Sequence, residues 1–202
     1  MPSISRIRFT NVIYENGAKR FNDDIFQFDG HNGALLIPNG GGKTVFVQTA
    51  IQAVLPHVEV ANRKIRDTLV LENTSAHVAI EWILSEKPRR YGLTAVTLFM
   101  NRGLVSSLKY VYEYEENDEN SIEKLPFVIQ SGSGNKRPAE KEEMGEYYLN
   151  MSRNKINAHE FSTIKEYQEY IEKNFKIVPW EWRKIALINS AEGGVEEFFN
   201  NC

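Results

Sequence analysis

Apolar and polar positions alternate over Ile4–Val12 and again over Asp24–Asp29. This period of two predicts two half-buried strands, with a turn at Asn16–Gly17 between them. The next apolar segment, Ala34–Ile37, does not alternate and predicts a short, fully buried strand. It leads through three consecutive glycines into Val45–Leu55, which is long and apolar enough for a helix. The chain is therefore expected to open with two strands, a buried strand, a glycine-rich turn and a helix.

Three further strands are predicted in the middle of the chain, over Ser75–Leu84, Tyr91–Phe99 and Leu108–Tyr114. The connection Lys87–Arg90 is too short for a crossover, so these strands are expected to form an antiparallel meander. The segment Ser131–Glu143 holds Gly, Ser, Lys, Arg and Glu with almost no apolar residue, which predicts a mobile loop.

The carboxy-terminal part predicts two helices and a strand. Ser162–Phe175 begins with an N-cap residue and places apolar residues at helical spacing. Pro179–Trp182 is typical of a helix start, because proline is tolerated in the first turn. The apolar run Ile185–Ile188 predicts a last short strand. A helix that begins at Val195–Phe199 has no end, so we expect residues 1–202 to be a fragment of a longer chain.

Composition narrows the class of protein. The 202 residues are 42% hydrophobic and 25% charged, which is typical of one soluble domain with enough apolar material for a core. The net charge of −3 excludes a basic coat over the whole surface, so any contact with nucleic acid must be local. The one cysteine, Cys202, excludes a disulfide framework and a zinc cluster. Neither a signal peptide nor a membrane span is predicted, so we expect a cytoplasmic protein without membrane partners.

The glycine-rich turn carries the chemistry of a phosphate-binding loop. Strand, glycine loop and helix in this order are the setting of a P-loop, whose backbone N–H groups surround a phosphate at the helix N-terminus. The lysine neutralises the β- and γ-phosphates of ATP, and the next hydroxyl binds Mg²⁺. The residues assigned to nucleotide binding are Asn39, Gly40, Gly41, Gly42, Lys43 and Thr44. The motif departs from G-x-x-x-x-G-K-[ST] at its first position, where Ile37 replaces glycine.

The groups that hydrolyse ATP are missing from the sequence. A P-loop ATPase needs an acidic residue after a second buried strand to hold Mg²⁺ and polarise the attacking water. The nearest match, Leu69–Glu72, is short, has no Asp and is explained more simply as a strand end or turn. No Leu-Ser-Gly-Gly signature is present either. We therefore assign no catalytic residue and expect ATPase activity only when another segment completes the site.

These features together resemble the amino-terminal half of an SMC-type ABC ATPase head. The resemblance rests on the Phe-x-Asn step in Arg8–Asn11, on Pro38–Thr44, and on the meander after the helix. The segments Phe161–Tyr167 and Ile185–Gly194 are similar to the corresponding part of MukB-like condensin subunits. The implied fold class is α/β, a P-loop NTPase of ABC/SMC-head type. Residues 1–202 would be its N-terminal lobe, with an antiparallel β-meander beside the P-loop core.

The resemblance also implies partners and a process. In this family the Walker B and signature motifs lie beyond a long coiled coil, which is outside this chain, and two heads close on ATP. The implied partners are the carboxy-terminal half of the same head, a second head, DNA contacted through its backbone, and non-SMC accessory subunits. The implied process is chromosome organisation and segregation, repair, or defence against plasmids and phages.

Two more roles follow from the resemblance, residue by residue. A Q-loop amide contacts Mg²⁺ in such heads, and the matching residue here is Asn189, with Gln130 as the competing candidate. An arginine beyond the P-loop helix senses DNA or reaches the nucleotide, and Arg63 and Arg66 lie in that stretch. A solvated basic loop is the alternative explanation for these two arginines.

Two other functions stay open. A free-standing P-loop NTPase or kinase of another branch would need a base or metal-binding Asp within the chain. A nucleotide-free interaction domain with a degenerate P-loop is permitted by Ile37, and nucleotide titration separates it from the SMC-type head. DNA contacts are predicted at Arg63–Arg66, Lys87–Arg90 and Lys136–Arg137 through phosphates, although each cluster is also explained as a solvated turn.

Overall fold

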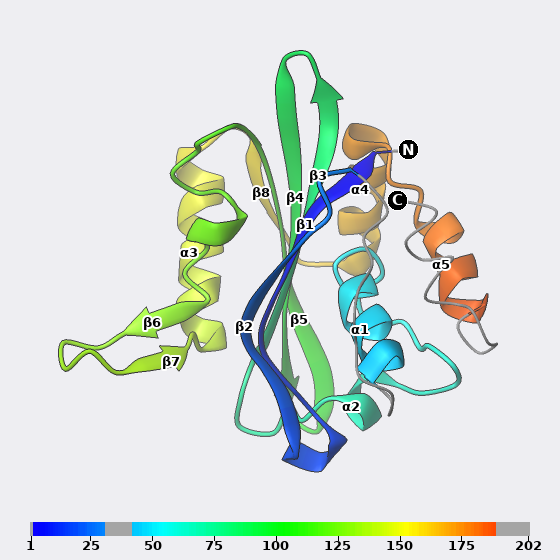
Figure 1. Cartoon of the computed structure of the whole chain (residues 1–202), viewed down its shortest axis with the longest axis vertical. Coiled ribbons are helices and arrows are strands. Elements are labelled where there is room, and N and C mark those ends of the chain that lie inside the picture. The colour runs from blue at the N-terminus through cyan, green and yellow to red at the C-terminus, as the bar shows by residue number, and fades with distance from the viewer. Residues whose placement is uncertain (1, 31–41, 189–202) are drawn as a thin grey trace.

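A six-stranded antiparallel sheet forms the centre of the computed structural model, which describes residues 2–30 and 42–188 (Figure 1). The strand order is β2-β1-β3-β4-β5-β8, and a separate hairpin pairs β6 with β7. The strands are β1 Ser3–Tyr14, β2 Lys19–Gln27, β3 Ala76–Glu86, β4 Arg89–Asn101, β5 Leu104–Glu115, β6 Val128–Gln130, β7 Lys136–Pro138 and β8 Ala158–Phe161. The helices are α1 Gly42–Ile51, α2 Ile65–Thr68, α3 Lys141–Asn154, α4 Ile164–Phe175 and α5 Pro179–Ile188, with 3₁₀ turns η1 Glu15–Gly17 and η2 Ile122–Lys124.

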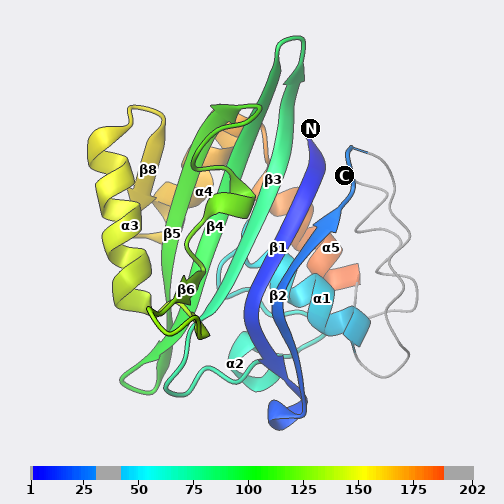
Figure 2. The same ribbon diagram turned by 60° about the vertical axis from the view of Figure 1, so that its left-hand side comes forward.

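Helices cover both faces of the sheet. Helices α1, α2, α4 and α5 lie on one face, while α3 and the β6–β7 hairpin lie on the other (Figures 1 and 2). Each face has its own cluster of buried apolar residues. The predicted combination of helices with an antiparallel sheet is confirmed, as are the meander β3–β4–β5 and the two opening strands.

The alternation in β1 divides its side chains between the two faces. Ile7 and Phe9 belong to the apolar cluster on the α1 face. Arg8 and Thr10 point to the opposite face, because successive side chains of a strand alternate. Ile7 pairs with Ile80 of β3, so the apolar stripe continues across the sheet. The central strands are therefore buried on both sides, one of them apolar and the other partly polar.

Asn11 has a structural role in this strand. Its φ is 56°, a left-handed conformation that asparagine tolerates better than most residues. Its side-chain Nδ2 donates to Thr74 Oγ1 at 2.6 Å and to the Ser75 carbonyl at 2.8 Å. The asparagine of the Phe-x-Asn step thus ties the middle of β1 to the segment that enters β3.

The prediction of one loop over Ser131–Glu143 is wrong. Only the residues at the tip of the β6–β7 hairpin are a turn; β7 follows, and α3 begins at Lys141. Helix α3 has a capping box between Glu140 and Glu143, and its buried residues Met144, Tyr148 and Met151 recur at helical spacing. The charged residues of this segment lie in the exposed strand β7 and around the partly exposed first turn of α3, which is why composition alone indicated a loop.

The prediction of a strand at Ile185–Ile188 is also wrong, because these residues form the last part of α5. A short apolar run does not distinguish a buried strand from a buried helical segment, and here it continues the helix that starts at Pro179. The helix predicted over Ser162–Phe175 is confirmed as α4, whose N-cap is Thr163. The strand predicted at Ala34–Ile37 and the helix predicted at Val195–Phe199 lie outside the described residues.

Buried charges hold the η2 segment against the α3 face. Arg8 donates to Asp23 through Nε at 2.9 Å, and its Nη1 donates to the carbonyls of Ile122 and Leu125 at 2.8 and 2.9 Å. Glu81, 1% exposed, accepts two hydrogen bonds from Arg6 at 2.9 Å each. Because each buried charge has a partner and further hydrogen bonds, the network avoids the large cost of an isolated buried ion.

His77 of β3 binds the segment that leads into α3. Its Nε2 donates to the Ala139 carbonyl at 2.8 Å, and its Nδ1 lies 2.9 Å from Thr97 Oγ1. The ring is fully buried and stacks on Phe127, with ring centroids 4.8 Å apart. Burial lowers the pKa of His77 from 6.5 to about 4, because the charged imidazolium loses its hydration.

We predict that His77 makes the protein less stable in mild acid. Between pH 6.5 and about 4, His77 is protonated in the unfolded chain but remains neutral in the folded chain. The free energy of unfolding therefore falls as the pH drops through this range. The loss reaches about 3 kcal/mol. His77→Gln should lower stability near neutral pH but flatten this slope, as measured by urea unfolding across the range. An unchanged slope in the variant would contradict the assignment.

Candidate functional site

The described part of the predicted phosphate loop is the first turn of α1. Gly42 begins the helix and is buried, Lys43 is exposed, and Thr44 is half-buried. The other assigned residues, Asn39, Gly40 and Gly41, lie outside the described residues. The exposed ammonium and the hydroxyl therefore sit side by side at the N-terminal end of a helix. That end carries partial positive charge from backbone N–H groups without intrahelical partners.

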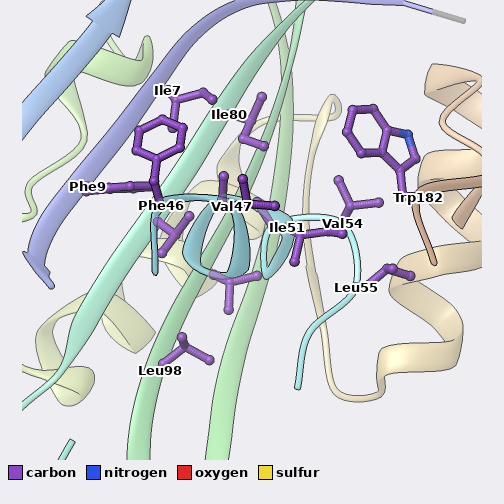
Figure 3. Packing of buried hydrophobic residues seen from close by; sticks show 14 of the residues in the cluster. Ile7, Phe9, Phe46, Val47, Ile51, Val54, Leu55, Ile80, Leu98 and Trp182 are labelled. Atoms are coloured by element: carbon purple, nitrogen blue, oxygen red, sulfur yellow. The ribbon is translucent and has the colours of Figure 1, made fainter. Parts of the chain in front are cut away.

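Helix α1 is apolar on almost every side, so other elements must pack around it. Every residue of Val45–Ile51 is buried. The Phe46 ring lies between Phe9 of β1 and Phe26 of β2, with both centroids 5.0 Å away. Figure 3 shows Phe46 and Val47 facing the sheet. A helix that is hydrophobic all round must be enclosed, so the sheet alone does not suffice to cover it.

Helices α4 and α5 complete the enclosure. Trp182 of α5 meets Trp82 of β3 edge to face, with ring centroids 5.4 Å apart. The Tyr167 hydroxyl of α4 donates to the carbonyl of Ala53, just beyond the end of α1. This end of α1 is thus closed by aromatic side chains, whereas the exposed Lys43 marks the opposite end.

Two glutamines of the α1 segment hold the chain that follows it, and sequence reasoning did not single them out. Gln48 Nε2 donates to the Arg63 carbonyl at 2.8 Å, and Gln48 Oε1 accepts from Thr68 Oγ1 at 2.7 Å. Gln52 Oε1 accepts from the backbone N–H of His57 at 2.7 Å. The sequence feature that could have identified these glutamines is their spacing. Thr44, Gln48 and Gln52 are four residues apart and so lie on one helix face.

The basic clusters differ in how they are paired. Arg90 donates to Glu113 at 2.7 Å, and Arg137 donates to Glu143 at 2.6 Å. Within the described residues, Arg63 and Lys64 are exposed and have no ion pair, and Arg66 reaches only the Gly103 carbonyl. The β3–β4 turn and α2 lie at opposite ends of the sheet (Figure 1), so these clusters do not form one surface.

Of the two candidates for the Mg²⁺-binding amide, only Gln130 lies within the described residues. Asn189 lies outside the described residues. Gln130 is the exposed last residue of β6, which lies across the sheet from α1 (Figure 1). The described residues contain no group of three or more His, Cys, Asp or Glu side chains arranged to hold a metal ion. The metal-binding role of either amide therefore stays a prediction.

The weak match to an acidic strand end is a turn. Leu69 forms an isolated bridge with Tyr14 at the end of β1, and Glu72 is exposed in the turn before β3. A cavity of about 600 Å³ lies beside this turn, between the β4–β5 turn and the start of α3. Its described lining includes Glu72, Arg102 and Lys141 but no residue of α1, so the cavity is separate from the candidate site.

A scan of the sequence against models of protein families found no match, and a search of curated proteins found none either. Across residues 2–30 and 42–188, no helix combines the length and the apolar character needed to cross a membrane.

We predict that the exposed end of α1 and its buried body respond differently to truncation. Lys43→Ala should change the free energy of unfolding by no more than about 0.5 kcal/mol, because the side chain is exposed and has no described ion pair. Phe46→Ala should cost about 3–5 kcal/mol, since it empties the contact with Phe9 and Phe26. Chemical denaturation of both variants checks this, and a large loss in Lys43→Ala would show that the lysine is structural.

Proposed function

We propose that this chain is the ATP-binding half of an SMC-like ABC ATPase head that dimerises on ATP and acts on DNA. The observation that carries the proposal is the contrast within α1. Lys43 is exposed on its first turn, directly after Gly42, while Val45–Ile51 are all buried. A glycine, an exposed lysine and a hydroxyl at the accessible end of an otherwise enclosed helix suit a polyphosphate.

The donor set fits ATP with Mg²⁺. Free N–H groups of the first turn would bind phosphate oxygens, and Lys43 would neutralise the charge of the β- and γ-phosphates. The Thr44 hydroxyl is a hard oxygen ligand of the kind that Mg²⁺ prefers. Asn39, Gly40 and Gly41 would supply loop backbone, and Asn189 would add an amide oxygen to the metal, because Gln130 in β6 lies across the sheet from α1.

Hydrolysis requires groups from elsewhere. The described residues contain no group of three or more His, Cys, Asp or Glu side chains arranged to hold a metal ion, and no signature segment occurs in the sequence. Phosphoryl transfer depends on groups positioned around the transferred phosphate. In an ABC-type pair these groups come from the carboxy-terminal half of the head and from the opposing head. This requirement favours a split head over a free-standing NTPase.

DNA contact fits the segment after α1 better than the other basic clusters. The arginines of the other two clusters are paired with carboxylates, which leaves one exposed lysine without a described ion pair in each, Lys87 and Lys136, whereas neither Arg63 nor Lys64 has an ion pair among the described residues. Backbone phosphates are the DNA groups that such lysines and arginines bind, without sequence readout.

We predict that Lys43→Ala weakens Mg-ATP binding by about tenfold to a hundredfold, the effect of losing one charge-assisted phosphate contact. Isothermal titration calorimetry against the parent measures this. Lys155→Ala is the matched control, because Lys155 is an exposed lysine at the end of α3 on the opposite face. Equal Mg-ATP affinity in the parent and in Lys43→Ala would contradict the role of Lys43 in phosphate binding and would favour a nucleotide-free interaction domain.

We also predict that residues 1–202 alone turn over ATP negligibly, and that adding the carboxy-terminal half of the head raises the rate. The physical reason is that this chain binds phosphate but does not position the attacking water. Phosphate release is measured for the chain alone, for the mixture, and for the mixture made with Lys43→Ala. Robust turnover by the chain alone that disappears in Lys43→Ala would instead support a free-standing NTPase.

A further inference from the structure

Gln48 is a fully buried polar residue on the helix that carries the proposed nucleotide site. It lies four residues after Thr44 on the same helix face, about 6 Å along the axis. Both ends of its amide are used, Nε2 toward the Arg63 carbonyl and Oε1 toward the Thr68 hydroxyl. One side chain therefore joins the first half of α1 to two points of the segment Val60–Thr68.

The partners of Gln48 do not need it to satisfy their hydrogen bonds. The Arg63 carbonyl also accepts from the backbone N–H of Val60 at 3.1 Å. The Thr68 hydroxyl also lies 3.3 Å from the Lys64 carbonyl, which can accept its proton. An apolar side chain at position 48 would thus leave neither group without a partner. Burying an amide costs desolvation free energy, so Gln48 adds little net stability. Its hydrogen bonds instead fix the position of α1 relative to the Val60–Thr68 segment.

The segment that Gln48 holds is a rigid turn. Val60 and Arg63 exchange two backbone hydrogen bonds at 3.1 and 3.0 Å. Between them Ala61 and Asn62 have φ values of 53° and 59°, a left-handed conformation that is costly for alanine. The turn continues directly into α2, whose Thr68 is the second partner of Gln48. A tight turn and a short helix are therefore both joined to α1 through the same side chain.

We propose that Gln48 is a positioning residue for the nucleotide site, which fixes the first turns of α1 against the Val60–Thr68 segment. The inference rests on the proposed function. Loss of this anchor lets the phosphate-binding end of α1 shift, and small misplacements of binding groups weaken the bound state. By reciprocity, nucleotide that orders this end of α1 also orders the segment that Gln48 holds.

The test combines nucleotide affinity with hydrogen–deuterium exchange of peptides that cover residues 60–68. Mg-ATP should slow exchange there in the parent. Gln48→Met keeps the length and burial of the side chain but removes the amide, so it should abolish this protection and weaken Mg-ATP binding by about fivefold or more. Gln52→Met is the matched control, because Gln52 lies one turn further from Lys43 and its side chain bonds to the His57 N–H and to the carbonyls of Gln48 and Val58, but to neither Arg63 nor Thr68; it should keep the parent's affinity and the protection of residues 60–68.

Thr68→Val provides a second variant should Gln48→Met fail to fold, since it removes only the donor to Gln48 Oε1, and it should reduce the protection in part. The inference is overturned if Gln48→Met keeps the parent's affinity and protection, if Gln52→Met changes them equally, or if the parent shows no nucleotide-dependent protection. Nucleotide binding that Lys43→Ala abolishes but Gln48→Met leaves unchanged would overturn this inference alone. A parent that binds no nucleotide would overturn the proposed function and this inference together.

Discussion

The enclosure of α1 is the constraint on which the rest of this structure depends. A helix whose residues are buried from Val45 to Ile51 has no solvent face, so apolar surface must meet it from more than one direction. The sheet supplies one side through Phe9 and Ile7, and α4 and α5 supply another. Each fully buried side chain of this kind contributes about 1.5–3 kcal/mol. The position of α1, and with it the position of Lys43, is thus a consequence of packing.

The two faces of the sheet are stabilised by different kinds of interaction. The α1 face is an apolar core, with aromatic pairs such as Phe46 with Phe9 and Trp182 with Trp82. The α3 face combines aromatic rings with buried ions, in which Arg8 and Glu81 bind groups from distant parts of the chain. Such ionic networks gain less net stability than apolar packing but require one specific arrangement of partners. Stability of the second face therefore depends on pH, whereas that of the first depends mainly on shape.

Among the described residues, the side-chain hydrogen bonds that the α1 segment makes lie along one line of the helix. Gln48 and Gln52 connect α1 to the segment that follows it, and Thr44 begins the same line. This arrangement places the exposed cations Arg63 and Lys64 on a segment that is tied to the proposed nucleotide site. In two of the other basic clusters an arginine is paired with a carboxylate, Arg90 with Glu113 and Arg137 with Glu143. The chemistry proposed for this chain is therefore concentrated at one end of α1 and the turn beside it.

The sequence by itself determined five of the six strands of the central sheet, all but β8, together with helix α4 and the composition of the proposed site. Alternation over β1 and the short β3–β4 connection required an antiparallel sheet, because both signals are local. The motif at Gly42–Thr44 was equally visible, since it consists of consecutive residues. Only the tertiary structure decided which segments were helices where local signals conflicted, as in the charged segment that begins α3 and the apolar run that ends α5. It also decided which cations are paired and that Gln48 joins Arg63 to Thr68, because those contacts link residues that the fold, and not the local sequence, brings together.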